Sequence, residues 1–256
     1  MSLDRSRVTA EIEVWGTIVW VDSYGPDSSA LDAGIAELRD YYDYIDIVFS
    51  TYKSGSEVSQ IRRGELKIES ANEDLQYVWQ ECLAAREITE GAFDPWCVEG
   101  GFDPSGYVKG WAADRGVEIM KRHGATNVQI NAAGDISLTG GFDGGPWSIG
   151  IRHPEDAHTI VKVIELVDGA IATSGTYEQG AHIRDPHTGL IAIGARSATV
   201  VGPDGGLAEA IATALIVEGR DGARWFQKPE LKGYYAWVID RHEDTSWEIT
   251  SDSFAP

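Results

Sequence analysis

The sequence predicts one compact α+β domain, with helices concentrated in the N-terminal half and strands in the C-terminal half. Apart from one strand near the start, helical patterns precede residue 124 and strand patterns follow residue 128. The 256 residues contain no internal repeat, low-complexity run or proline-rich linker that would divide the chain. Since 43% of the residues are hydrophobic and 10% aromatic, the chain can form a sizeable core. We therefore treat residues 1–256 as a single unit.

The first half of the chain combines one strand with several helices. Residues 8–23 are rich in β-branched residues and end at a Gly-Pro-Asp sequence, which predicts one long strand and a turn. Apolar residues three to four positions apart then predict a helix with Asp27 at its N-cap. In the helix that begins near residue 104, Asp103 is expected as the cap and Pro104 as the first helical residue. The predicted helices cover residues 28–48, a short segment from 56, residues 72–89 and residues 104–123.

The second half of the chain is rich in strand patterns, interrupted by a single helix at residues 206–217. Because the strands do not alternate regularly with helices, a parallel βαβ sheet is not expected. The candidate strands cover residues 128–138, 147–152, 161–167, 170–173, 181–184, 192–201, 234–240 and 247–249.

The formal net charge of −20 excludes a nucleic-acid role, because phosphate contacts require a basic surface. An acidic protein also repels anionic ligands, so a phosphate ligand would need a metal ion or local donors. Cys82 and Cys97 are too few for a disulfide framework or a zinc site, and Cys82 is expected in the core. No membrane-spanning run, signal peptide or lipobox cysteine is visible, which predicts a cytoplasmic protein unless an export signal has been removed.

Three polar motifs lie close together between Ile171 and Thr213. They are Thr173-Ser174-Gly175, the segment from His182 to Gly189, and the helical pattern that contains Glu209. Each could be a turn or a cap, but together they supply a glycine turn, an imidazole and two oxygen ligands. This combination is typical of a site for a phosphate ester and a hard metal ion.

A repeated Phe-Asp-Pro motif precedes these segments, at residues 93–95 and 102–104. Either aspartate could serve as a turn or cap residue. The second copy leads into Gly106 and Gly110, which lower helix stability and indicate a close approach to the backbone. The helix N-terminus favours an anion there, and Lys109 would add a positive charge.

Glu209 and Thr213 lie four residues apart and therefore share one face of a helix. A carboxylate and a hydroxyl, completed by carbonyl and phosphate oxygens, would form a site for Mg²⁺, which we expect in a surface cleft. Alanines at 208, 210, 212 and 214 would let a ligand or another backbone come close. The alternative is an exposed glutamate and a threonine that bonds back to the preceding turn.

Two further motifs allow both structural and functional interpretations. Gly134-Asp135 interrupts an apolar strand pattern, which indicates a strand-end turn, a bulge or a close ligand approach. His182 comes just before an Asp-Pro turn and could either anchor that turn or act as a base near neutral pH.

The ordered set of motifs resembles the ApbE family, the FAD:protein FMN transferases, over roughly residues 12–220. The individual motifs are weak, but seven of them occur in the family order. The resemblance implies a T-fold-like α+β domain that transfers FMN from FAD to a threonine of a partner protein, releases AMP and requires Mg²⁺. The matching segments are residues 49–52, 56–59, 91–95, 103–114, 134–135, 173–175, 182–189 and 209–219.

The resemblance also implies roles for single residues. Glu209, Thr213 and the Gly106 carbonyl match metal ligands, and His182 matches a histidine that assists removal of the threonine proton. The residues at FAD-contact positions or in the matching motifs beside them are Tyr52, Ala92, Phe93, Asp94, Asp103, Lys109, Thr173, Ser174, Gly175 and Ile183. The implied partner is a flavoprotein with an exposed threonine, such as a redox or electron-transport subunit. Its identity and the oligomeric state of this chain stay open.

The chain departs from the family pattern at several positions. Glu209 stands where the family usually has Asp, and the added methylene reaches roughly 1.5 Å further. Trp15 replaces a methionine, and Arg62 stands at a position that is often Asn. Two alternative functions use the same residues: an FAD pyrophosphatase, in which water replaces the threonine, and a non-catalytic FAD-binding protein.

Overall fold

One large antiparallel sheet organises the fold. The computed structural model describes residues 5–175, 183–241 and 245–251. Eight strands form the sheet: β1 (Ser6–Val14), β2 (Thr17–Gly25), β3 (Asn127–Ala132), β4 (Asp135–Thr139), β7 (Gly169–Gly175), β8 (Ala195–Gly202), β9 (Tyr235–Asp240) and β10 (Ser246–Thr250). They follow this same order across the sheet. A separate hairpin consists of β5 (Trp147–His153) and β6 (Asp156–Leu166).

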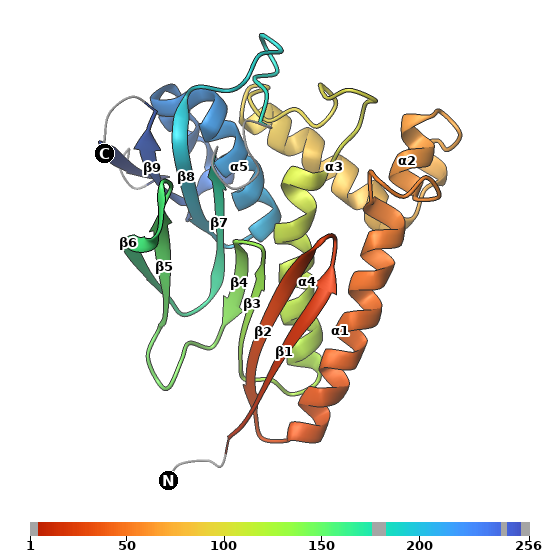
Figure 1. Ribbon diagram of the computed structural model, residues 1–256, viewed down its shortest axis with the longest axis vertical. Helices are drawn as coiled ribbons and strands as arrows, with labels where there is room; N and C mark the ends of the chain where they lie inside the picture. Colours follow the sequence, from red (N-terminus) through yellow and green to blue (C-terminus); the bar gives the residue numbers. More distant parts are fainter. Residues whose placement is uncertain (1–4, 176–182, 242–244, 252–256) are drawn as a thin grey trace.

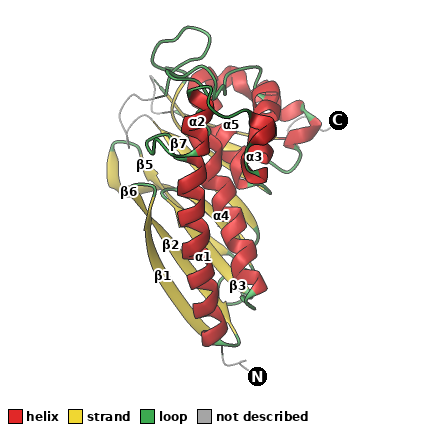
Figure 2. Cartoon of the chain, turned by 90° about the vertical axis from the view of Figure 1, so that its right-hand side faces the viewer, coloured by secondary structure: helices red, strands yellow, loops and turns green. Residues whose placement is uncertain are grey.

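Helices cover one face of this sheet (Figures 1 and 2). The α-helices are α1 (Ser28–Phe49), α2 (Glu57–Arg62), α3 (Glu73–Ile88), α4 (Ser105–Arg122) and α5 (Gly205–Glu218). Short 3₁₀ helices lie at η1 (Ile68–Ser70), η2 (Gly219–Gln227) and η3 (Pro229–Leu231). Asp27, Ser56 and Asn72 cap α1, α2 and α3 through hydrogen bonds to backbone N–H groups, so these three predicted starts are confirmed.

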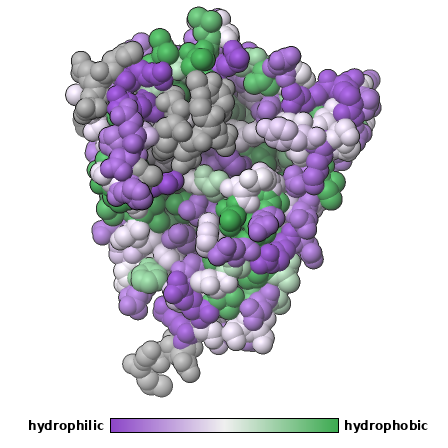
Figure 3. Space-filling model, viewed as in Figure 1, coloured by the Kyte–Doolittle hydropathy of each residue, from purple (hydrophilic) through white to green (hydrophobic). Residues whose placement is uncertain are grey.

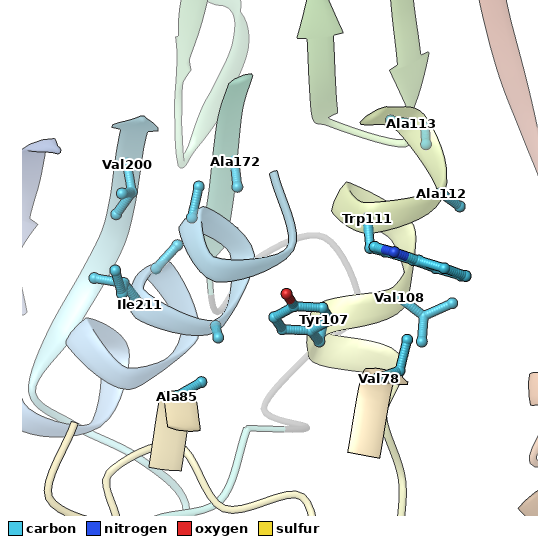
Figure 4. Packing of buried hydrophobic residues seen from close by; sticks show 14 of the residues in the cluster. Val78, Ala85, Tyr107, Val108, Trp111, Ala112, Ala113, Ala172, Val200 and Ile211 are labelled. Atoms are coloured by element: carbon cyan, nitrogen blue, oxygen red, sulfur yellow. The ribbon is translucent and has the colours of Figure 1, made fainter. Parts of the chain in front are cut away.

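Two alternating side-chain sets produce two cores. On β9, Ala236 and Val238 join the helix-side core, whereas Trp237 and Ile239 join the core beneath the β5–β6 hairpin. The fully buried Cys82 belongs to the helix-side core, as predicted. Figure 4 shows Tyr107 of α4 directed toward α5 within this core. Helices therefore cover one face of the sheet, and the β5–β6 hairpin covers part of the other.

The predicted strand at residues 8–23 is wrong, because the segment folds into the β1–β2 hairpin. Its turn is Trp15-Gly16, and both residues have positive φ values of 55° and 71°. Such a turn usually carries Asn or Gly, which is why the tryptophan concealed it. Residues 128–138 likewise form the β3–β4 hairpin, so of the interpretations left open for Gly134-Asp135 the structure has the turn.

Two other expectations need correction. Pro104 is the N-cap of α4 rather than its first residue, and Asp103 instead accepts hydrogen bonds from the Ser105 N–H and hydroxyl. The predicted strand at residues 181–184 falls partly outside the described residues. Its described part forms one isolated bridge, Arg184 with Ile191, because the chain turns at once through Asp185.

The surface agrees with the acidic composition. On the face seen in Figure 3, hydrophilic residues predominate and hydrophobic ones form small separated patches. Across the described ranges 5–175, 183–241 and 245–251, no helix is long and apolar enough to span a membrane.

Candidate active site

Helices α4 and α5 meet through glycines. A Cβ atom on Gly110 would lie 2.2 Å from the Gly205 carbonyl oxygen, so only glycine permits this approach. Tyr107 similarly occupies the space that a side chain on Gly206 would need. The predicted close approach to the glycines of α4 is therefore a contact between two helix backbones. It brings Glu209 of α5 against the first turns of α4.

Glu209 is buried in this contact. Its residue is 3% exposed, and its Oε2 atom accepts a hydrogen bond of 3.0 Å from the Gly110 N–H. Its Oε1 atom pairs with the Lys109 ammonium. The exposed glutamate considered as the alternative from the sequence is thus wrong. Helix α5 is buried nearly all round, because its alanines pack against neighbouring elements.

Lys109 joins two buried carboxylates. Its Nζ atom lies 2.6 Å from Asp135 Oδ2 and also contacts Glu209. Both carboxylate side chains are about 5% exposed or less, whereas the lysine side chain is 31% exposed. The sequence marks Gly134-Asp135 as a turn, a bulge or a close ligand approach and as a family motif, but the place of Asp135 at the start of β4 beside α4 could not be inferred from spacing. These three residues form the acidic cluster of the site.

Burial controls the electrostatics of this cluster. Burial, followed by the charge of Asp135, raises the pKa of Glu209 to about 8, although Lys109 and the Gly110 N–H act in the opposite direction. Burial likewise raises the pKa of Asp135. For Lys109, burial lowers the pKa, but the two carboxylates outweigh it and raise the pKa above its ordinary value. Lys109 therefore stays charged, and the raised pKa values mean that the two carboxylates bind a proton more strongly than exposed carboxylates do.

Hydroxyl and backbone oxygens lie next to this cluster. The Thr213 hydroxyl is 3.0 Å from the Ser174 hydroxyl on β7, so it faces a neighbouring strand. Gly106 departs from helical geometry (φ −85°, ψ 16°), and a Cβ atom there would lie 3.7 Å from Thr213 Oγ1 and 3.1 Å from Phe93. A backbone oxygen can serve as an external ligand only where regular helical hydrogen bonding is interrupted. The structure thus brings Gly106, Thr213 and Ser174 together.

The other predicted residues lie on several different elements. Phe93 and Ala92 are buried near Gly106, and the turn at His187 comes within contact distance of Gly91. Thr173 and Gly175 share β7 with Ser174, and the Thr173 hydroxyl is 2.9 Å from that of Thr199. Ile183 is half-buried against the main core. His182 lies outside the described residues.

Of three other predicted contact residues, two have partners elsewhere in the structure and one is exposed. Asp94 accepts a hydrogen bond from the Trp96 N–H and pairs with Arg86 at 2.7 Å, while Asp103 stabilises its own turn. These contacts match the turn and cap alternative considered for both aspartates. Tyr52 is 96% exposed on the turn after α1. The structure does not bring these side chains into the acidic cluster.

An open hollow of about 610 Å³ adjoins the site on the opposite side of the sheet. Gly134 and Thr173 line it, and each is followed in the chain by a site residue, Asp135 or Ser174. At the β3–β4 turn, consecutive residues therefore belong to the two sites: Gly134 lines the hollow and Asp135 belongs to the acidic cluster. Other lining residues include Thr17, Ile18, Trp20, Asn131, Ile149 and Arg152.

Comparison with known proteins decides the family. The model of the ApbE family matches residues 10–99 and 99–236. The chain belongs to the ApbE family. It is 34% identical over 165 residues to the FAD:protein FMN transferase of Vibrio cholerae, and 33% over 128 residues to that of Rhodobacter capsulatus.

The extent of the ApbE match differs between sequence and structure. The two alignments cover 60% and 46% of this chain but only 49% and 24% of those relatives, so the chain spans about half or less of their length. The solved flavin transferase ApbE from Vibrio cholerae superposes with a TM-score of 0.82 at 25% identity, over 98% of both chains. The predicted α+β fold is thereby confirmed.

Proposed function

We propose that this protein transfers FMN from FAD to a threonine hydroxyl of an acceptor protein, requires Mg²⁺ and releases AMP. Two relatives named FAD:protein FMN transferase and the shared family support the proposal. The observation that carries it is the acidic cluster of Lys109, Asp135 and Glu209 beside Thr213. A cation, two carboxylates and a hydroxyl at one point suit a pyrophosphate and a divalent metal ion.

The residues present fit Mg²⁺ in their chemistry. Glu209, Thr213 and the Gly106 carbonyl are all hard oxygen donors, which this ion prefers. Gly106 also leaves free the space that a Cβ atom would take beside Thr213 Oγ1. In the described part of the chain, no group of three or more His, Cys, Asp or Glu side chains could hold a metal ion. Phosphate oxygens of the substrate would therefore complete the set of ligands.

The chain's own groups would orient the dinucleotide around the β3–β4 turn. The hollow lined by Gly134 and Thr173 can accept one half of FAD, while the pyrophosphate reaches the acidic cluster. Lys109 would offset the phosphate charge, and the Ser174 hydroxyl would donate to a phosphate oxygen. When bound, Mg²⁺ would neutralise the pyrophosphate and polarise the phosphorus under attack.

The transfer itself replaces the phosphoanhydride bond of FAD with a phosphoester bond to the threonine. The threonine oxygen forms a bond to the FMN phosphorus, the bond to the bridging pyrophosphate oxygen breaks, and AMP leaves with that oxygen. The family resemblance makes His182 the proposed base that takes the threonine proton. Positioning and electrostatic stabilisation would supply most of the acceleration.

The decisive experiment incubates the protein with FAD and Mg²⁺, with and without an acceptor that carries an Asp-(Ser/Thr)-Gly-(Ala/Ser)-(Ala/Thr) segment. An acceptor mass increased by FMN, together with equimolar AMP, is the expected result. AMP release that does not require the acceptor would indicate an FAD pyrophosphatase, and FAD binding without AMP would indicate a binding protein. Either result would overturn the transferase proposal.

Two controls make this experiment specific. Glu209→Ala should lose Mg²⁺-dependent FAD cleavage, whereas Glu248→Ala on the exposed strand β10 should keep it. The fluorescence of FAD should be quenched when FAD and the protein are titrated. The response to NAD should be weaker, because the chain has no Gly-x-Gly-x-x-Gly turn after a strand. An equal or tighter response to NAD would contradict the assignment of FAD as the substrate.

A further inference from the structure

Both oxygens of the Glu209 carboxylate already have protein partners. Oε1 contacts the Lys109 ammonium, and Oε2 accepts the Gly110 N–H at 3.0 Å. The Gly110 N–H belongs to the helix backbone and is fixed by the glycine contact between α4 and α5. The lysine is the only one of these two donors that can move away by rotating its side chain. Any cation that binds Glu209 through Oε1 must therefore replace the ammonium.

The cluster also has an unbalanced charge. When both acids are ionised, two carboxylates that each contact one ammonium leave one net negative charge between elements that bury both acids. The lysine side chain is 31% exposed, whereas its partners are about 5% exposed or less, so it enters from the more open side. Lys109 can thus move its Nζ atom away from Glu209 while that atom keeps its second ion pair, with Asp135 Oδ2 at 2.6 Å.

We propose that Lys109 is an exchangeable internal cation, which occupies the metal position on Glu209 and leaves it when Mg²⁺ binds. The displaced ammonium stays paired with Asp135 and becomes available to the pyrophosphate. This proposal rests on the proposed function, since it assumes the same metal-dependent site. Its consequence is an order of events: metal binding releases the positive charge that helps to hold FAD.

The length of the side chain at position 209 supports this exchange. Glu209 reaches Lys109 across the contact of α4 and α5 while it still receives the Gly110 N–H. An aspartate would be shorter by one methylene, roughly 1.5 Å, and could not keep both contacts without movement of a helix. The backbone contact between Gly110 and Gly205 prevents that movement. Glu209→Asp should therefore release the lysine as well.

The test measures Mn²⁺ binding without FAD, by electron paramagnetic resonance of the free ion. Lys109→Met keeps most of the length of the side chain and removes the charge. It should bind Mn²⁺ about 10- to 100-fold more tightly than the parental protein, because the metal no longer displaces a hydrogen bond between charged groups. Lys162→Met, which removes a lysine of β6 paired with Glu248 of β10, should leave Mn²⁺ affinity unchanged.

A double variant separates exchange from simple repulsion. Lys109→Met/Asp135→Asn has the same net charge in the cluster as the parental protein, and it avoids an unpaired pair of buried acids if the single variant does not fold. Exchange predicts tighter Mn²⁺ binding by the double variant, since Glu209 Oε1 is free. An affinity equal to or weaker than the parental value would overturn the proposal.

A second readout follows the lysine itself. The side-chain ammonium signal of Lys109 in ¹H–¹⁵N spectra, assigned by its loss in Lys109→Met, should shift when Mg²⁺ is added. A signal unchanged at saturating Mg²⁺ would overturn the exchange even if FAD is cleaved, which would leave the proposed function intact. A parental protein that neither binds Mn²⁺ nor cleaves FAD would overturn both.

Discussion

Asp114 should make the stability of this protein depend on pH. One of its carboxylate oxygens accepts the Ser137 hydroxyl of β4, and the other accepts the Gly205 N–H at 2.7 Å, so it connects α4, β4 and α5. Burial raises its pKa from 3.8 to about 7. Between these values the native protein binds a proton that the unfolded chain does not, and the free energy of unfolding falls as pH rises.

Asp114→Asn removes the titration and preserves the contacts. An asparagine can accept from Gly205 N–H through its oxygen and donate to Ser137 through its amide. The full shift of about three pKa units corresponds to roughly 4 kcal/mol, and the part between pH 5.5 and 8 to about 2 kcal/mol. Across that window the parental protein should lose about 2 kcal/mol relative to the variant.

Urea denaturation followed by tryptophan fluorescence at several pH values would measure this difference. The contribution of Glu209 is present in both proteins and cancels. Asp168→Asn is the matched control: a hydrogen bond from Thr139 lowers the pKa of Asp168, so its titration falls below this window. Asp168→Asn should change the free energy of unfolding by the same amount at each pH in this window and leave its slope with pH unchanged. Parallel curves for the parental protein and Asp114→Asn would refute the reasoning.

Three further changes test the site. Gly110→Ala would place a Cβ atom 2.2 Å from the Gly205 oxygen and should destabilise the protein by about 3 kcal/mol or more in urea denaturation, whereas Gly55→Ala, which meets no atom within 4 Å, should be nearly neutral. Glu209→Asp should preserve or raise Mg²⁺-dependent AMP release; a loss as severe as that of Glu209→Ala would show that the longer carboxylate is required. His182→Asn should bind FAD almost normally but release AMP about 10²–10⁴-fold more slowly, and transfer by the parental protein should weaken as pH falls below the histidine pKa. Full transfer by the asparagine variant would remove His182 from the mechanism.

Local signals in the sequence predicted most helices. Asp27, Ser56 and Asn72 each supply a side-chain oxygen just before an apolar periodic segment, and each caps a helix in the structure. The two hairpins were missed or left open because their turns contain Trp15-Gly16 and Ala133-Gly134. Trp15 packs its ring against Tyr42 of α1, a tertiary contact that no local pattern reports, and Ala133 is an exposed residue at positive φ that a propensity for turns does not single out.

The membership of the site was only partly predictable. The resemblance pointed to Lys109, Thr213 and Glu209, but helical spacing says only that two side chains share a face. It does not say what that face contacts. The pairing of Lys109 with Glu209, one hundred residues along the chain, depends on how α5 packs on α4. Asp94 and Tyr52 show the converse, since matching positions in a motif did not bring their side chains to the cluster.

The glycines explain why a buried glutamate is tolerated in α5 at all. A carboxylate in an apolar helix is costly unless donors satisfy it. The contact of Gly110 with Gly205 brings the backbone of α4 close enough for the Gly110 N–H to reach Oε2, and it places Lys109 on Oε1. The glycines that lower the helix stability of α4 therefore also allow the close packing that brings the two donors to Glu209. Residues that look unfavourable in each helix alone become compatible only when the two helices meet, and the chemistry of the site depends on that contact.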